Sequence, residues 1–108
     1  MAKRQVRNIK IDTEAIVKQA LETVATKTLD TDKARARLVF YGHTNPEQSL
    51  IEKLAYEMAV LAELGHLTGA NVSGQVGKWD MSNETTIHAA FNSYLNRRVA
   101  GMRSRWNG

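Results

Sequence analysis

The chain has 108 residues, of which 43% are hydrophobic and 24% charged, and its formal net charge is +4. This length and composition predict a single globular domain that buries a core without help from metals or cross-links. Because the sequence contains no cysteine, disulfides, thiolate zinc sites, iron–sulfur clusters and thiol nucleophiles are excluded.

No apolar stretch approaches the roughly 20 residues that span a bilayer. The basic N-terminus is not followed by an apolar stretch, which excludes a secretory signal. We therefore expect no membrane contact, and a location in the cytoplasm or within an assembled particle.

The charge is unevenly distributed along the chain. Residues 1–10 and residues 85–108 each carry four basic residues and no acid, whereas residues 11–84 have a net charge of −4. We interpret residues 1–11 as a basic N-terminal arm and residues 12–108 as a single helical domain.

The first predicted helix covers residues 13–28. Asp12 is a favourable N-cap, and Glu14 lies in the first turn, where the helix dipole stabilises an acidic side chain. Apolar residues then recur at helical spacing along one face, from Ile16 through Val24.

The segment 33–41 is ambiguous. As a helix it would be capped by Asp32 and stopped by Gly42, whereas as a strand Ala34 to Tyr41 would alternate between two faces. A strand here would find only one comparable partner near the N-terminus, and a lone two-stranded pair is marginal. The helix is therefore favoured.

The third predicted helix, residues 46–64, has the clearest boundaries. Asn45 is suited to cap it, Pro46 to occupy the first helical position, Gln48 to complete a capping box and Gly65 to end it. Its apolar surface is very broad, so we expect this helix to lie at the centre of the core or to be covered by another subunit.

The last predicted helix covers residues 83–103. A helix of this length would be about 31 Å long, comparable to the width of the whole domain. We therefore expect its last turns to project. The predicted fold is all-α, with four helices.

The Gly-rich segment 66–81 has two open interpretations. It lacks the spacing of a phosphate-binding loop, because Gly77-Lys78 is followed by Trp79 and no strand precedes it. It could supply the turn and second helix of a helix-turn-helix unit, although Gly74 and Gly77 disfavour a helix. The favoured interpretation is a long loop, mobile or ordered by a partner, with Trp79 as an anchor against the core or a neighbour.

No residue pattern indicates catalysis. The histidines His43, His66 and His88 lack the spacing of metal ligands, and the serines lack the context of a nucleophile. The glutamates of segment 46–64 form a solvated face rather than a pair of catalytic carboxylates. We expect no enzyme activity, no metal, no cofactor and no small-molecule substrate.

The basic ends favour binding to nucleic acid, DNA or RNA, mainly through phosphates. On a helical wheel, one flank of the last helix carries Tyr94, Arg97, Arg98 and Arg105, so arginines alternate with an aromatic ring that could stack on a base or sugar. The predicted nucleic-acid-binding residues are Lys3, Arg4, Arg7, Lys10, Lys78, Tyr94, Arg97, Arg98 and Arg105.

The alternative function is that of a structural or assembly subunit, such as a virion or adaptor component. Uncovered apolar area on the third helix would favour a homo-oligomer. The predicted interface residues are Leu54, Met58, Leu61 and Trp79.

Overall fold

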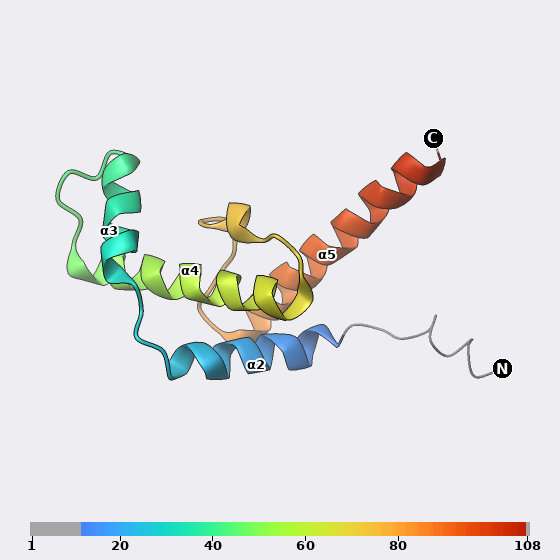
Figure 1. Ribbon diagram of the computed structural model, residues 1–108, viewed down its shortest axis with the longest axis horizontal. Coiled ribbons are helices and arrows are strands. Elements are labelled where there is room, and N and C mark those ends of the chain that lie inside the picture. Colours follow the sequence, from blue (N-terminus) through green and yellow to red (C-terminus); the bar gives the residue numbers. More distant parts are fainter. Residues whose placement is uncertain (1–11, 108) are drawn as a thin grey trace.

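The structure, a computed structural model, describes the backbone of residues 12–107 and the side chains of residues 12–98. Within these residues it contains four α-helices and no strand, which confirms the predicted all-α fold. The predicted arm, residues 1–11, lies outside the described residues. The elements in chain order are α2 (Thr13–Ala25), α3 (Thr31–Phe40), α4 (Gln48–Thr68), the short 3-10 helix η1 (Ser73–Gln75) and α5 (Glu84–Asn107) (Figure 1).

Helix α2 begins as predicted. The Asp12 carboxylate accepts a hydrogen bond of 3.0 Å from the backbone N–H of Ala15, which satisfies one of the free donors in the first turn. The helix ends at Ala25, three residues earlier than predicted. It ends there because Thr26 folds back, with both its backbone N–H and its hydroxyl donating to the carbonyl of Thr23.

Helix α3 resolves the ambiguity of segment 33–41 in favour of the helix. Its cap is Asp30 rather than Asp32, because the Asp30 carboxylate accepts a 2.9 Å hydrogen bond from the N–H of Lys33. Ala34 and Leu38, one turn apart, are buried and pack with residues of α4 in a small second core.

Helix α4 differs from its predicted boundaries of 46–64 at both ends. The predicted cap at Asn45 is wrong, since the helix begins at Gln48 with no side-chain cap. Gly65 does not end the helix either. The end is at Gly69, which adopts a left-handed φ of 77° and donates a 2.7 Å hydrogen bond to the carbonyl of Gly65, a geometry that glycine adopts without strain.

The broad apolar surface of α4 is explained by its central position. Helix α2 packs on one side of it, while α3 and the loop that contains η1 contact other parts of its surface (Figure 1). The main core joins α2, α4, the loop and α5, with its largest fully buried side chains at Val17, Val60, Leu61, Leu64, Val72, Ile87 and Phe91.

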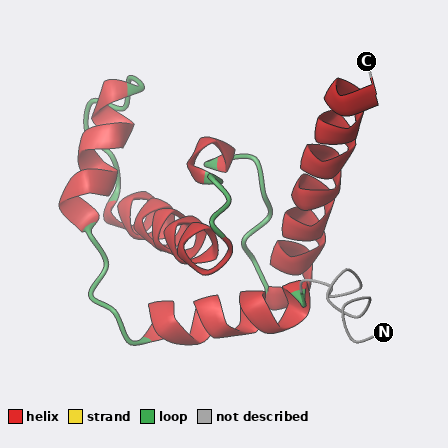
Figure 2. Cartoon of the chain, turned by 45° about the vertical axis from the view of Figure 1, so that its right-hand side comes forward, coloured by secondary structure: helices red, strands yellow, loops and turns green. Residues whose placement is uncertain are grey.

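Helix α5 starts at Glu84 behind Asn83, whose side chain accepts a 3.0 Å hydrogen bond from the N–H of Thr86. Its N-terminal half packs against α2, and its C-terminal half extends away from the other helices (Figure 1). The helix runs to Asn107, beyond the predicted end at 103. In Figure 2, α3 and α5 rise on the same side of α4, with η1 between them.

The helix-turn-helix interpretation of segment 66–81 is wrong. Residues 66–68 still belong to α4. Between α4 and α5, the only regular element is the three-residue 3-10 helix η1. The segment nevertheless has anchors in its own chain, because Val72 and Trp79 are buried in the main core. The glycines allow the chain to turn between these anchors, and Gly77 has a φ of 81° that a side chain would strain.

Candidate nucleic-acid interface

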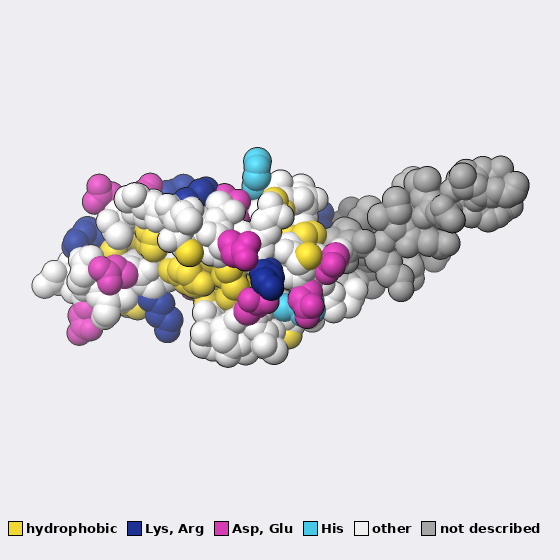
Figure 3. Space-filling model, turned by 90° about the horizontal axis from the view of Figure 1, so that it is seen from below, with side chains coloured by type: hydrophobic (Ala, Val, Ile, Leu, Met, Phe, Trp, Pro, Cys, Tyr) yellow, Lys and Arg dark blue, Asp and Glu magenta, His cyan; other side chains and the backbone are white. Residues whose placement is uncertain are grey.

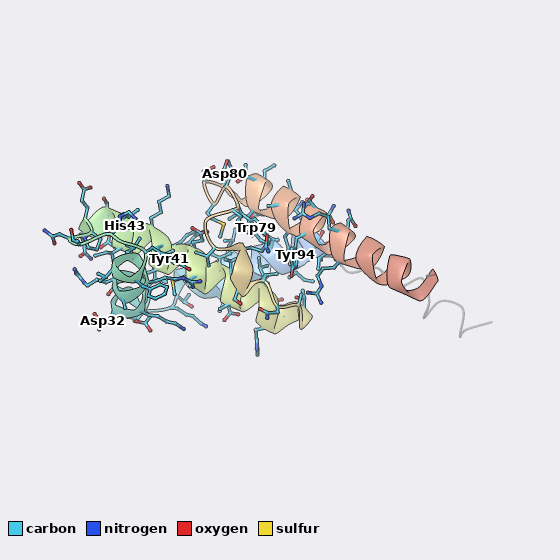
Figure 4. All side chains as sticks on the ribbon, turned by 90° about the horizontal axis from the view of Figure 1, so that it is seen from above. Asp32, Tyr41, His43, Trp79, Asp80 and Tyr94 are labelled. Carbon is cyan, nitrogen blue, oxygen red and sulfur yellow. The ribbon has the colours of Figure 1, made fainter. Side chains whose placement is uncertain are left out.

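Trp79 and Tyr94 form the junction between the loop and α5. The Trp79 ring lies 5.9 Å from the ring of Phe91 and 6.2 Å from that of Tyr94, distances typical of tilted aromatic pairs. The Tyr94 hydroxyl donates a 2.7 Å hydrogen bond to the backbone carbonyl of Asn71. Figure 4 shows Trp79 and Tyr94 together beside α5. The two rings therefore fix the loop against the helix.

Arg98 lies on the outer side of this junction. Its guanidinium stands 5.8 Å from the centre of the Tyr94 ring, within the range of a cation–π interaction. Its Nη1 also donates a 3.1 Å hydrogen bond to the Tyr94 hydroxyl. Tyr94, one helical turn before Arg98, thus holds the guanidinium in a defined position. Arg98 is nevertheless exposed.

Arg97 is exposed beside Arg98 and donates a 3.3 Å hydrogen bond to the hydroxyl of Ser93. Among the residues whose side chains are described, the single ion pair joins Lys27 to Glu63 at 2.6 Å. Neither arginine is therefore neutralised by a carboxylate in this part of the chain. Two adjacent cations that are exposed and not neutralised are suited to phosphate oxygens.

Glu57 holds the loop from the opposite side. This α4 carboxylate is only 8% exposed, and its Oε2 accepts a short hydrogen bond from the backbone N–H of Gly77. A buried carboxylate requires such a donor, since an unpaired one would be costly. Glu57 was predicted to lie on a solvated face, and its burial corrects that interpretation. A helical wheel of α4 does not include the loop, so the pattern of residues along α4 could not indicate this contact.

Asp80 closes the turn before α5. Its carboxylate accepts a 3.0 Å hydrogen bond from the backbone N–H of Ser82. Hydrogen bonds from the Ser82 side chain and backbone, with a smaller contribution from the positive charge of Lys53, hold the pKa of Asp80 below its ordinary value of 3.8. Asp80 is therefore a charged turn residue at neutral pH.

The remaining predicted contacts are dispersed. Lys3, Arg4, Arg7 and Lys10 lie outside the described residues, and for Arg105 only its place in α5 is described. Lys78 is exposed in the loop. Tyr94 is half-buried, bonded through its hydroxyl and covered by Arg98, so its ring is not a free surface for stacking.

The predicted oligomer-interface residues fall into two pairs. Leu61 and Trp79 are buried in the main core of one chain. The loop packs against that part of α4, so these residues have little surface left for a partner. Leu54 and Met58 are half-buried around the smaller core. Figure 3 shows a group of apolar side chains on the face seen there, beside the acidic groups.

One group of acidic side chains lies away from the loop. Asp12, Glu14 and Glu22 are exposed on α2, and Figure 3 shows acidic groups spread over that helix. Helix α2 lies on the side of α4 away from η1 (Figure 1). These carboxylates would repel a polyanion from this face of α2.

Sequence reasoning missed the cations of α3. Lys33 and Arg37, one helical turn apart, line a depression of about 140 Å³ with Ser73 and Val76 of the loop. The loop lies beside these two cations in the depression. It is also connected to Arg98, because the Tyr94 hydroxyl bonds both to Asn71 and to Arg98. The i, i+4 spacing of these cations was a visible signal, but it depended on the helical interpretation of segment 33–41.

His88 links α2 to α5, with 2.8 Å between its Nε2 and the hydroxyl of Thr13.

Among the described residues, no group of three or more histidines and carboxylates is arranged to hold a metal ion, and no helix is long and apolar enough to cross a membrane. Comparisons of the chain with protein-family models, curated proteins and solved structures found no match.

Proposed function

We propose that this protein is a non-enzymatic, nucleic-acid-binding domain that contacts mainly backbone phosphates through the loop-facing flank of α5. The observation that carries the proposal is the position of Arg98. Its guanidinium is held by the ring and hydroxyl of Tyr94, so less side-chain freedom is lost when it binds a phosphate.

The charge distribution supports the same surface. Arg97 adds a second exposed cation beside Arg98, and Lys78 adds an exposed cation in the loop that Tyr94 fixes. The acidic exterior of α2 lies on the other side of α4. Such an arrangement orients the protein on a polyanion, even though residues 11–84 are acidic overall.

The test is a salt titration of binding to a labelled duplex of about 20 base pairs, measured by fluorescence anisotropy. Affinity is expected to fall steeply with salt, with a logarithmic slope of about 0.9 for each phosphate neutralised. The variant Arg98→Glu should bind more weakly and with a smaller slope. The matched control is Lys18→Glu, which changes the net charge equally on the exposed face of α2 and should bind nearly as the wild type does. Absence of wild-type binding to duplex and single strand at low salt would contradict the proposal.

A second candidate function is assembly into a homo-oligomer. The half-buried Leu54 and Met58, together with the apolar group of side chains visible in Figure 3, favour it. Contact between copies would remove this apolar surface from water. Leu61 and Trp79 are left out of this interface because they lie in the core of the chain itself.

A further inference from the structure

Two exposed aromatic rings stand at the C-terminal end of α3. Phe40 is 82% exposed and Tyr41 is 65% exposed, and the preceding Val39 is 50% exposed. The two rings meet edge to face, with 5.4 Å between their centres and 71° between their planes. Ala34 and Leu38 are buried on α3, whereas the three residues that follow Leu38 are exposed. Figure 4 shows Tyr41 at the α3 end of the molecule, far from the Trp79–Tyr94 junction.

Cations lead along α3 to these rings. Lys33, Arg37 and Phe40 are spaced by four and three residues, which places them on one flank of the helix. Lys33 and Arg37 both line the depression that the loop borders, so this flank faces the loop. Residues 33–46 contain no aspartate or glutamate, and the single described ion pair lies elsewhere. The positive charge beside the rings is therefore not neutralised within the segment.

We propose that Phe40 and Tyr41 form a stacking platform for the bases of a single-stranded nucleic acid, with Lys33 and Arg37 contacting its phosphates. Stacking on exposed aromatic rings combined with a cationic track is a general way to bind single strands without sequence preference. This inference rests on the proposed function and specifies its ligand as a single strand. The aromatic ring expected at Tyr94 is engaged in the loop junction, whereas the rings of Phe40 and Tyr41 at the end of α3 are exposed.

The single strand follows from the geometry of the rings. Bases in a duplex are stacked on their neighbours and present only their edges in the grooves, whereas an unpaired base offers its whole face. Because α3 and α5 rise on the same side of α4 (Figure 2), one strand could contact the α3 platform and the arginines of α5. An apolar protein partner would not account for the cations along the same flank.

The experiment compares binding of labelled oligo(dT) and of a duplex of equal length by fluorescence anisotropy. Phe40→Ala and Tyr41→Ala should each weaken oligo(dT) binding about 5- to 150-fold, the range typical of one lost stacking contact. Because no charge is removed, the salt slope should stay unchanged. Duplex affinity should change little. Phe40→Trp should retain binding, since it keeps a ring for stacking.

The control is Val39→Ala, which removes exposed apolar surface from the same helix end without removing a ring. It should bind oligo(dT) as the wild type does. As these side chains are exposed, none of the substitutions is expected to unfold the domain, and circular dichroism would verify this. Ultraviolet cross-linking to oligo(dT) should label the tryptic peptide 38–53, which contains both rings.

The outcomes separate this inference from the proposed function. Strong wild-type binding that is unaffected by both alanine variants would overturn the stacking platform and leave phosphate binding by α5 intact. Wild-type binding to neither oligo(dT) nor duplex at low salt would overturn both. Loss of self-association by Phe40→Ala, with unchanged oligo(dT) affinity, would assign the rings to contact between copies and would also overturn the platform.

Discussion

The hydroxyl of Tyr94 donates a 2.7 Å hydrogen bond to the backbone carbonyl of Asn71. These residues lie 23 positions apart in the sequence, and their contact fixes the start of the loop to the middle of α5. The same hydroxyl accepts a hydrogen bond from Arg98. The position of the loop and the position of a proposed phosphate-binding cation therefore depend on one side chain.

Tyr94→Phe should lower the free energy of unfolding by about 1–2 kcal/mol, since the hydrogen bonds to Asn71 and from Arg98 are both lost while the ring remains. Amide exchange should accelerate in residues 70–78, and urea denaturation monitored by circular dichroism would give the stability change. Arg97→Ala is the control, because it removes only an exposed hydrogen bond to Ser93. Equal loop exchange in wild type and Tyr94→Phe would show that the contact to Asn71 does not hold the loop.

Glu57 provides a second test of loop fixation. Glu57→Gln keeps an oxygen that can accept from the N–H of Gly77 and should cost about 1 kcal/mol through loss of the charge. Glu57→Leu removes the acceptor and should cost about 2 kcal/mol. Limited trypsin digestion should then cut after Lys78, which is exposed in the loop, faster in the Leu variant than in the Gln variant. The same cleavage rate in both would contradict an anchoring role for this acceptor.

Two glycines should respond oppositely to alanine. A Cβ atom at Gly65 would lie 2.9 Å from the backbone carbonyl oxygen of Ala70, so Gly65→Ala should destabilise the protein by about 1–3 kcal/mol, although alanine is the better helix former. At Gly74 a Cβ atom would meet nothing within 4 Å. Gly74→Ala should be neutral or stabilising by up to about 1 kcal/mol. Thermal denaturation of both variants measures the difference, and a stabilising Gly65→Ala would contradict the close approach of the loop.

The pKa of Asp80 gives a pH test. It lies below 3.8 because hydrogen bonds from Ser82 stabilise the carboxylate. A depressed pKa in the folded state means that the stabilisation is present above pH 3.8 and is lost as the pH falls through the lower, folded value. An NMR titration of the Asp80 carboxyl should have its midpoint below 3.8, and Ser82→Ala should move it upward. An unchanged midpoint in Ser82→Ala would show that the hydroxyl does not contribute.

Self-association is tested by sedimentation equilibrium at micromolar concentration. If copies of the chain associate through the exposed part of α4, the substitution Met58→Glu should dissociate the oligomer, because it would place a charge in an apolar contact. Ser49→Glu, at an exposed position on the opposite face of α4, is a control for charge on the same helix. A wild-type mass of 12.1 kDa, that of a single chain, would contradict assembly and leave α4 as the centre of one domain.

The sequence by itself determined the helical class and the approximate position of each helix. Apolar periodicity fixes which residues face inward, and the Asp12 cap and the Gly42 turn depend on neighbouring residues alone. It also determined the basic ends and the breadth of apolar surface on α4. These properties are local, so the residues that produce them lie within a few positions of one another.

The tertiary structure alone decided the environment of individual side chains. Gly65 lies within α4, and Gly69 ends the helix with a left-handed backbone conformation. Which of the two glycines adopts this conformation depends on the direction in which the chain leaves α4. Glu57 is buried rather than solvated because a loop 20 residues away covers it. Tyr94 is engaged at a junction, whereas Phe40 is exposed, since packing between distant segments determines which aromatic ring loses its contact with water. Periodicity carries no information about such contacts, and they determine which surface is free to bind.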